Sequence, residues 1–235
     1  MKLELEVHPA QTEILNALLF VPTARFSDLN KTGITNDHFT FHIKRLVELG
    51  LVKKDGLKYS LTPIGKEFAN RFDTEEKVVE KQAKLGVLLV PIKKEGGKIK
   101  YLTQQRLKQP YFGFWGWATG KIKWGEDVLT TAARELKEET NLEGDLNWVG
   151  IWHKIDFSKS DGHLLEDKFF FVVRVDNARG ELTENFDGGR NIWQTKEELL
   201  KQDKIFEAVE QAIALAEKKT FAHFEQKCFY TDDEY

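Results

Sequence analysis

One segment of the sequence fixes the relative positions of three acidic side chains. Residues 127–140 predict an amphipathic helix, on which Glu135, Glu138 and Glu139 have the spacing i, i+3 and i+4. This spacing puts all three carboxylates on one face of the helix. The apolar face of the same helix is formed by Val128, Leu129, Ala132, Ala133 and Leu136. Three like charges held together repel one another, so the pattern predicts a positively charged partner for them.

A hard divalent cation would resolve that repulsion. Ligand sets made only of oxygen atoms suit Mg²⁺, and Mn²⁺ can substitute for it. A bound Mg²⁺ also retains water molecules, one of which can attack a phosphorus atom. The alternative is a solvated acidic helix face, because Arg134 and Lys137 lie close by in the sequence.

The segment from Gly120 to Leu142 resembles the Nudix box, Gly-x5-Glu-x7-Arg-Glu-U-x-Glu-Glu-x-Gly-U, where U is a bulky aliphatic residue. Each fixed position is matched except one, at which Asn141 replaces the last glycine. Asparagine is the best substitute for glycine in the left-handed conformation that ends a helix. We therefore expect little effect on the metal site, and the spacing favours the cation site over the solvated face.

The resemblance implies a Mg²⁺-dependent hydrolase that cleaves a diphosphate linkage, and it assigns roles by position. Glu138 and Glu139 correspond to the principal metal ligands, Glu135 to a further ligand, and Gly120 to a residue whose carbonyl approaches the metal because it lacks a Cβ. The partners that orient the helix and its carboxylates would be Arg134 and Glu126. The catalytic residues would be Glu135, Glu139, Arg134 and Glu184. The general base stays open between Glu139, Glu135 and an acid from a later loop, where we prefer Glu184 to Asp187.

Residues before the box supply candidates for substrate binding. Trp115 or Trp117 could stack on a base, although packing in the core is the alternative for aromatic residues here. Arg106 could contact a phosphate. The resemblance implies a nucleoside diphosphate derivative as substrate, and the sequence does not distinguish among such derivatives.

The first part of the chain predicts three helices, a hairpin and a last helix, and residues 8–73 resemble the winged helix-turn-helix domains of prokaryotic regulators. We expect helices that start at Pro9, near Ser27 as a cap, after Thr35, and at Thr62-Pro63. The recognition helix would present Thr35, Asn36, His38, Thr40, His42, Lys44 and Arg45. Residues 1–73 have a net charge of only +1. Binding of DNA, docking of another domain and homodimerisation therefore all stay open.

The predicted fold class is α/β. We expect a winged-helix domain at residues 1–73, a helical linker at 74–84, and a Nudix α/β/α sandwich with a mixed sheet and a C-terminal helix at 85–235. Strands are predicted at 85–92, 99–104 and 168–175. A helix is predicted at 196–218, with a break near Asp203.

Composition limits the function classes further. The net charge of −3 provides no global attraction for nucleic acid, and the single cysteine, Cys228, cannot form an internal disulfide. The sequence predicts no signal peptide and no membrane segment, so we expect a cytoplasmic protein.

Two functional classes remain. The first is an enzyme that uses its N-terminal domain for dimerisation, localisation or substrate capture. The second is a transcription regulator whose Nudix domain senses a nucleotide metabolite. The intact set of predicted metal ligands favours the enzyme, because a sensor need not keep them.

Overall fold

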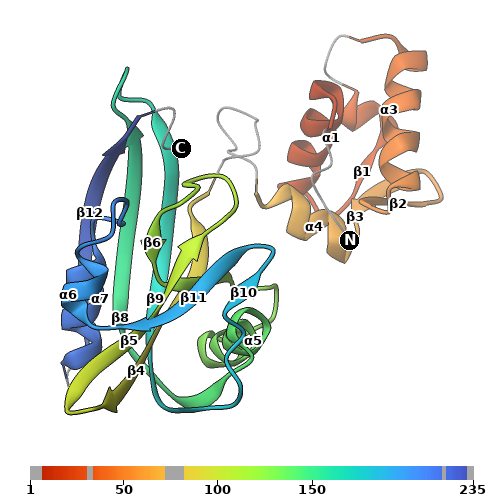
Figure 1. The fold of residues 1–235 in the computed structure, drawn as a ribbon. Coiled ribbons are helices and arrows are strands. Elements are labelled where there is room, and N and C mark those ends of the chain that lie inside the picture. Colours follow the sequence, from red (N-terminus) through yellow and green to blue (C-terminus); the bar gives the residue numbers. More distant parts are fainter. Residues whose placement is uncertain (1–6, 31–33, 72–81, 219–220, 232–235) are drawn as a thin grey trace. The chain divides into compact units, whose positions relative to one another are not determined.

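The structure is a computed structural model that describes residues 7–30, 34–71, 82–218 and 221–231. These residues belong to two compact units that divide between residues 81 and 82, and each unit is considered by itself (Figure 1). Most of the helical linker predicted at 74–84 lies outside the described residues, and Lys84 is the first residue of a strand. None of the described helices is long and apolar enough to cross a membrane.

The first unit has the predicted order of helices, hairpin and helix. Its elements are α1 (Pro9–Leu19), β1 (Ala24–Arg25), α2 (Phe26–Leu29), α3 (Asn36–Glu48), β2 (Val52–Asp55), β3 (Lys58–Leu61) and α4 (Pro63–Ala69). The strands form an antiparallel sheet in the order β1-β3-β2. As predicted, Pro9 begins α1, and the side chains of Thr35 and Thr62 cap α3 and α4. The assignment of this unit to the winged-helix class stays a prediction.

Two details of the first unit differ from expectation. The cap of α2 is Arg25 and not Ser27, because the Asp28 carboxylate accepts the Arg25 backbone N–H at 3.0 Å and the helix starts two residues earlier. His42 is not presented on the surface of α3. It is buried, and its ring stacks on that of His8 with centroids 4.3 Å apart.

The second unit is built around one large mixed sheet. Its elements are β4 (Lys84–Glu95), β5 (Lys98–Arg106), β6 (Trp115–Gly116), β7 (Ala118–Lys121), α5 (Val128–Thr140), β8 (Glu143–Ser158), β9 (Leu164–Arg179), β10 (Asn185–Phe186), β11 (Gly189–Gln194), α6 (Lys196–Leu199), α7 (Val209–Glu217) and β12 (Ala222–Tyr230). The strand order is β10-β11-β5-β4-β9-β8-β12, with β6 beside β5 and β7 beside β4. The pairs β4/β9 and β8/β12 are parallel, and the other pairs are antiparallel.

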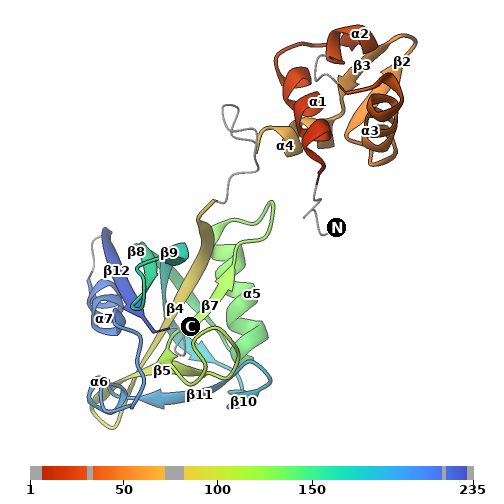
Figure 2. The same cartoon turned by 90° about the horizontal axis from the view of Figure 1, so that it is seen from above.

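Alternate residues of β4 bury against helices on opposite faces of the sheet. Val87 and Leu89 belong to the core beneath α5, whereas Leu88 and Val90 belong to the core beneath α7. Figure 2 shows α5 on one side of the sheet and α6 and α7 on the other. The unit is therefore an α/β/α sandwich, as predicted.

The predicted strands lie within β4, β5 and β9, which are all longer than expected. The predicted C-terminal helix is broken, as anticipated, into α6 and α7. Backbone pairing explains the break. Trp115 donates its N–H to the carbonyl of Lys204 at 2.8 Å and accepts the N–H of Phe206 at 3.0 Å, so this segment bonds to β6 and not to a helix.

Candidate active site

Helix α5 holds the acidic residues in place through both of its ends. The Asp127 carboxylate caps the first turn by accepting the N–H of Thr130 at 2.8 Å. Asn141 ends the helix with φ 60° and ψ 14°, the left-handed conformation that was predicted for it. Between the caps, Ala132 and Leu136 are fully buried against the sheet. The glutamates lie beside this buried face, where Glu135 packs against Gly120 of β7 and Glu139 accepts from Gln104 of β5.

Arg134 lies among the acidic residues and contacts three of them. Its guanidinium makes two hydrogen bonds of 2.8 Å to Glu126, one of 2.6 Å to Glu135 and one of 3.1 Å to Glu138. The hydrogen bonds from Arg134 lower the pKa of Glu126 to about 2. Glu126 also accepts the Thr131 hydroxyl at 3.0 Å, so it ties Arg134 to the first turn of α5.

Gly120 and Glu135 are packed so closely that glycine is required. A Cβ at position 120 would lie 1.9 Å from Cδ of Glu135. Gly86 on the neighbouring strand leaves similar room, because its Cβ would lie 2.7 Å from the carbonyl oxygen of Gly120. We predicted that Gly120 lets its own carbonyl approach a metal. The structure adds that Gly120 makes space for the Glu135 side chain.

Glu139 is the most enclosed of the three glutamates on α5. Burial raises the pKa of its carboxyl group, while the Gln104 side-chain amide donates to it at 3.1 Å. Asn191 on β11 donates its amide to the Glu139 carbonyl at 2.8 Å, which fixes the backbone at this point. The carboxylate is thus desolvated, and a bound cation would offset that cost.

An open cavity of about 670 Å³, here called the outer cavity, lies over the glutamates. It is lined by Lys84, Leu85, Gly86, Arg106, Lys108, Gln109, Pro110, Thr119, Gly120, Lys121, Lys123, Arg134, Glu135, Glu138, Glu139, Glu166, Lys168 and Phe170. Among the described residues, no three acidic, histidine or cysteine side chains converge on one point. Glu135 and Glu138 instead contact Arg134. The donor set of carboxylates and a backbone carbonyl nevertheless has the chemistry that Mg²⁺ prefers.

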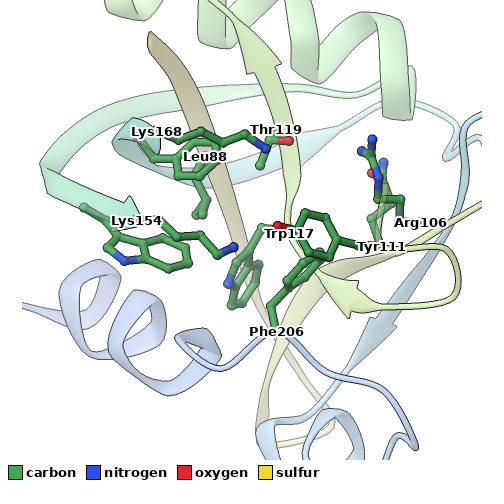
Figure 3. Close-up of a pocket in the computed structure, with 11 residues that line it drawn as sticks. Leu88, Arg106, Tyr111, Trp117, Thr119, Lys154, Lys168 and Phe206 are labelled. Carbon is green, nitrogen blue, oxygen red and sulfur yellow. The ribbon is translucent and has the colours of Figure 1, made fainter. Parts of the chain in front are cut away.

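A second and smaller cavity, here called the inner pocket, shares part of its lining with the outer one. Figure 3 shows the side chains that line the inner pocket. Its volume is about 70 Å³, and Leu88, Gln104, Arg106, Tyr111, Trp117, Thr119, Trp152, Lys154, Lys168, Phe170 and Phe206 line it. Four residues line both cavities, namely Arg106, Thr119, Lys168 and Phe170. The inner pocket therefore combines apolar walls with basic side chains directly beside the glutamates of α5.

Comparison with known families identifies the second unit. A family model described as the NUDIX domain matches residues 83–215, which is more than half of the chain. The chain belongs to the Nudix family.

Solved structures share the Nudix fold. The mutator MutT protein from Bacillus halodurans aligns with a TM-score of 0.50 at 20% identity, over 65% of this chain and 93% of that one. The NUDIX domain of NrtR from Shewanella oneidensis, crystallised with ADP ribose, aligns with a TM-score of 0.50 at 19% identity, over 66% of this chain and 97% of that one. At such identities the likeness concerns the fold alone. A search of the curated proteins finds no match.

The residues of the predicted Nudix box lie together in space. Those that line the outer cavity are Gly120, Arg134, Glu135, Glu138 and Glu139, and Glu126 lies behind them on Arg134. Glu184 lies apart. Its side chain is exposed and lines neither cavity. The metal-binding and catalytic roles of all these residues stay predictions.

The predicted substrate-binding residues have different environments. Arg106 lines both cavities, but its guanidinium also donates to the carbonyls of Pro110 and Gln109 at 2.5 and 3.2 Å, which holds the following turn. Trp117 lines the inner pocket. Trp115 is buried in the core beneath α7 and lines neither cavity, so its position fits the packing alternative.

Sequence reasoning missed Lys154 and Lys168, which bring positive charge into this Nudix unit's interior. Burial lowers the pKa of both ammonium groups, and it lowers that of Lys168 to about 7 with a contribution from neighbouring cations. Each lysine stands in a strand among apolar and charged residues, where an exposed position is the ordinary expectation. The one signal was the apolar run directly after Lys168, which predicted a strand buried on both faces.

Proposed function

We propose that the Nudix unit is a Mg²⁺-dependent hydrolase that cleaves the diphosphate linkage of a nucleoside diphosphate derivative. Membership of the Nudix family supports a hydrolase of nucleotide derivatives. The observation that carries the proposal is the position of the α5 glutamates against Gly120 beneath an open cavity rich in basic residues. Acidic groups suit a cation, and basic groups suit phosphates.

The residues that would hold the cation are Glu135, Glu138, Glu139 and the carbonyl of Gly120. When bound, Mg²⁺ supplies a polarised water and stabilises charge on the phosphate oxygens. Arg134 would keep the carboxylates oriented through Glu126, which anchors it by two hydrogen bonds. Mn²⁺ has the same preference for oxygen donors and would substitute.

The chain's own basic residues would bind the phosphates. Arg106, Lys108, Lys121 and Lys123 line the outer cavity and offer positive charge to an incoming diphosphate. The acid that accepts a proton from water is to be sought in Glu135 or Glu139. Glu184 is exposed and lines neither cavity, so its assignment as base is the less favourable one.

The proposal is tested with a panel of nucleotides and Mg²⁺, scored for released phosphate or nucleoside monophosphate. Glu139→Gln and Glu138→Gln keep the size and helix propensity of the side chains, so folding should persist. We expect turnover to fall roughly 100-fold or more, as for loss of a group that stabilises charge in the transition state. Lys137→Ala is the matched control, because Lys137 contacts Glu143 and the Asn141 carbonyl and not the cavity. Near-normal turnover by Glu139→Gln would show that the metal assignment is wrong.

A regulator that senses a nucleotide is the second candidate. Helix α3 of the first unit exposes Asn36, His38, Lys44 and Arg45, which have the chemistry for phosphate or base contacts. The NUDIX domain of NrtR was crystallised with ADP ribose, and ligands of that class are therefore the ones to test first with the present chain. Mobility-shift assays at low salt test this candidate, and failure to bind any DNA would exclude it.

A further inference from the structure

A buried lysine and a partly buried lysine face each other across neighbouring strands of the Nudix sheet. Lys154 on β8 and Lys168 on β9 are direct partners in the antiparallel register. Only 5% of the Lys154 side chain and 23% of the Lys168 side chain is exposed. Like charges directly opposite each other on a sheet are destabilising. The pair therefore needs a compensating negative charge.

That charge is supplied by two acids, one against each lysine. Asp156 contacts Lys154, and Glu166 contacts Lys168. The Glu166 carboxylate also lies 2.9 Å from the ammonium group of Lys84. Neither acid lines the inner pocket. All of the charged residues that do line it are basic, namely Arg106, Lys154 and Lys168. The charged groups that a ligand in the inner pocket would meet are therefore all basic.

Further donors reinforce this character. Trp117 lines the pocket, and its buried indole N–H has no hydrogen-bond acceptor among the described residues. Thr119 adds a hydroxyl group to the same wall. A ligand rich in acceptor oxygens would satisfy such groups, whereas an apolar ligand would leave them unpaired.

The size of the pocket selects among acceptor-rich ligands. A volume of 70 Å³ has room for about five water molecules. A phosphate group has five heavy atoms, while a nucleobase is substantially larger. The outer cavity, at about 670 Å³, has ample room for a nucleoside.

The position of the pocket relates such a group to the glutamates of α5. Gln104 lines the inner pocket and donates its side-chain amide to Glu139 at 3.1 Å. Thr119 lines both cavities and immediately precedes Gly120. A ligand in the inner pocket would thus lie one side chain away from the predicted cation site.

We propose that the inner pocket binds a phosphate-like anionic group carried beyond the diphosphate that is cleaved. Lys154 and Lys168 would recognise it, with Arg106 at the junction of the two cavities. The substrate class is then a nucleotide with a further anionic group, either the terminal phosphate of a nucleoside triphosphate or a phosphate on a linked sugar. The position of the cleaved diphosphate rests on the proposed function, whereas anion binding in the inner pocket does not.

Binding is measured first in EDTA, so that hydrolysis plays no part. The probes are inorganic phosphate and tripolyphosphate. Their binding is measured by calorimetry and by tryptophan fluorescence, since Trp117 and Trp152 line the pocket. We expect Lys168→Met to weaken binding roughly tenfold or more, as for loss of a charge-assisted hydrogen bond. Glu166 keeps Lys84 as its partner in this variant, so folding should persist. Lys168→Arg should retain most of the affinity.

Lys94→Met is the matched control, because Lys94 is exposed towards the other end of β4. The proposal would be overturned if Lys168→Met left the affinity for the probes unchanged, or if Lys94→Met lowered that affinity by the same factor. The proposal would also be overturned if a nucleoside bound more tightly than tripolyphosphate and Lys168→Met weakened the binding of that nucleoside. The pocket would then be a base site.

Activity then distinguishes the two sources of the anionic group. With Mg²⁺, nucleoside triphosphates are compared with diphosphates, and a diphosphate linked to a phosphorylated sugar is compared with its unphosphorylated counterpart. In each comparison, Lys168→Met should raise the KM of the substrate that carries the extra phosphate and leave the KM of the other substrate unchanged. Equal effects on both members would contradict the proposal. Phosphate binding without any hydrolysis would instead reject the proposed enzyme while the anion site stands.

Discussion

At the scale of residues, Glu135 is held from two sides by groups with different roles. Arg134 compensates its charge through a hydrogen bond of 2.6 Å, and Gly120 provides the space that its side chain fills. An arginine that contacts three acids keeps them from repelling one another in the absence of a cation. The helix can therefore fold before any metal is bound.

Gly120→Ala should disrupt this arrangement. The new Cβ would overlap Cδ and Cγ of Glu135, both 1.9 Å away, and would push the carboxylate off Arg134. We expect Mg²⁺-dependent turnover to fall by roughly 100-fold, as for loss of a positioned electrostatic group. Circular dichroism should show an unchanged fold. An alanine variant with normal turnover and normal Mg²⁺ dependence would show that Glu135 can move at no cost.

Lys168 makes stability depend on pH. Its pKa of about 7 is below that of a lysine in an unfolded chain, so above pH 7 the unfolded state binds more protons and stability rises with pH. The charged and titratable groups facing it are Lys84, Arg106, Tyr111, Lys154, Asp156 and Glu166. From pH 7 to 8.5 we expect this residue to contribute a rise of about 1–2 kcal/mol. Denaturant unfolding at both pH values should show a smaller rise in Lys168→Met, and an identical rise would exclude a low pKa.

At the scale of elements, α5 ends where its sequence departs from the Nudix pattern. Asn141 adopts the left-handed conformation, and its side chain donates to the carbonyl of Glu181 at 3.0 Å. The amide thus ties the helix end to a later loop, which glycine could not do. This hydrogen bond offsets the weaker preference of asparagine, compared with glycine, for the left-handed conformation.

Two substitutions at Asn141 should separate these contributions. Asn141→Gly removes the hydrogen bond but suits the backbone, so the free energy of unfolding should change by less than about 1 kcal/mol. Asn141→Val is β-branched and disfavours positive φ, and it should cost about 2 kcal/mol or more. Thermal unfolding measures both. A valine variant as stable as the parent would mean that the helix end relaxes to another conformation.

Local patterns predicted α5, the left-handed residue at its end and the strands β4 and β5, because these depend on residues close together in the sequence. The strands β8 and β12 were not predicted. The former mixes exposed and buried positions and contains register shifts, and the latter pairs in parallel with it from the end of the chain. The inner pocket was missed for the same reason. Lys154 and Lys168 become neighbours only through the register of β8 and β9.

At the scale of the whole molecule, the two units have separate hydrophobic cores. One core includes Phe39 and Leu46, and the cores of the Nudix unit lie on the two faces of its sheet. A unit with its own core is expected to fold by itself. The glutamates and both cavities belong wholly to the second unit.

A chain of residues 82–235 should therefore keep hydrolytic activity. We expect kcat/KM within about threefold of the full-length value, because each residue assigned to the site is present and the core is intact. Steady-state kinetics on the preferred substrate, with gel filtration of both proteins, checks this. A loss of tenfold or more, together with a smaller oligomer, would mean that the first unit assembles an active dimer.

Consecutive residues of β7 serve opposite sides of the sheet. Thr119 lines the inner pocket, whereas Gly120 contacts the carboxylate helix, and their partners on β4 are Leu88 and Val87. Apart from Gln104, which donates to Glu139, positions that face the inner pocket can therefore change without disturbing the glutamate-facing ones. Over evolutionary time this division would let descendants of one such chain acquire new substrates while inheriting the same chemistry.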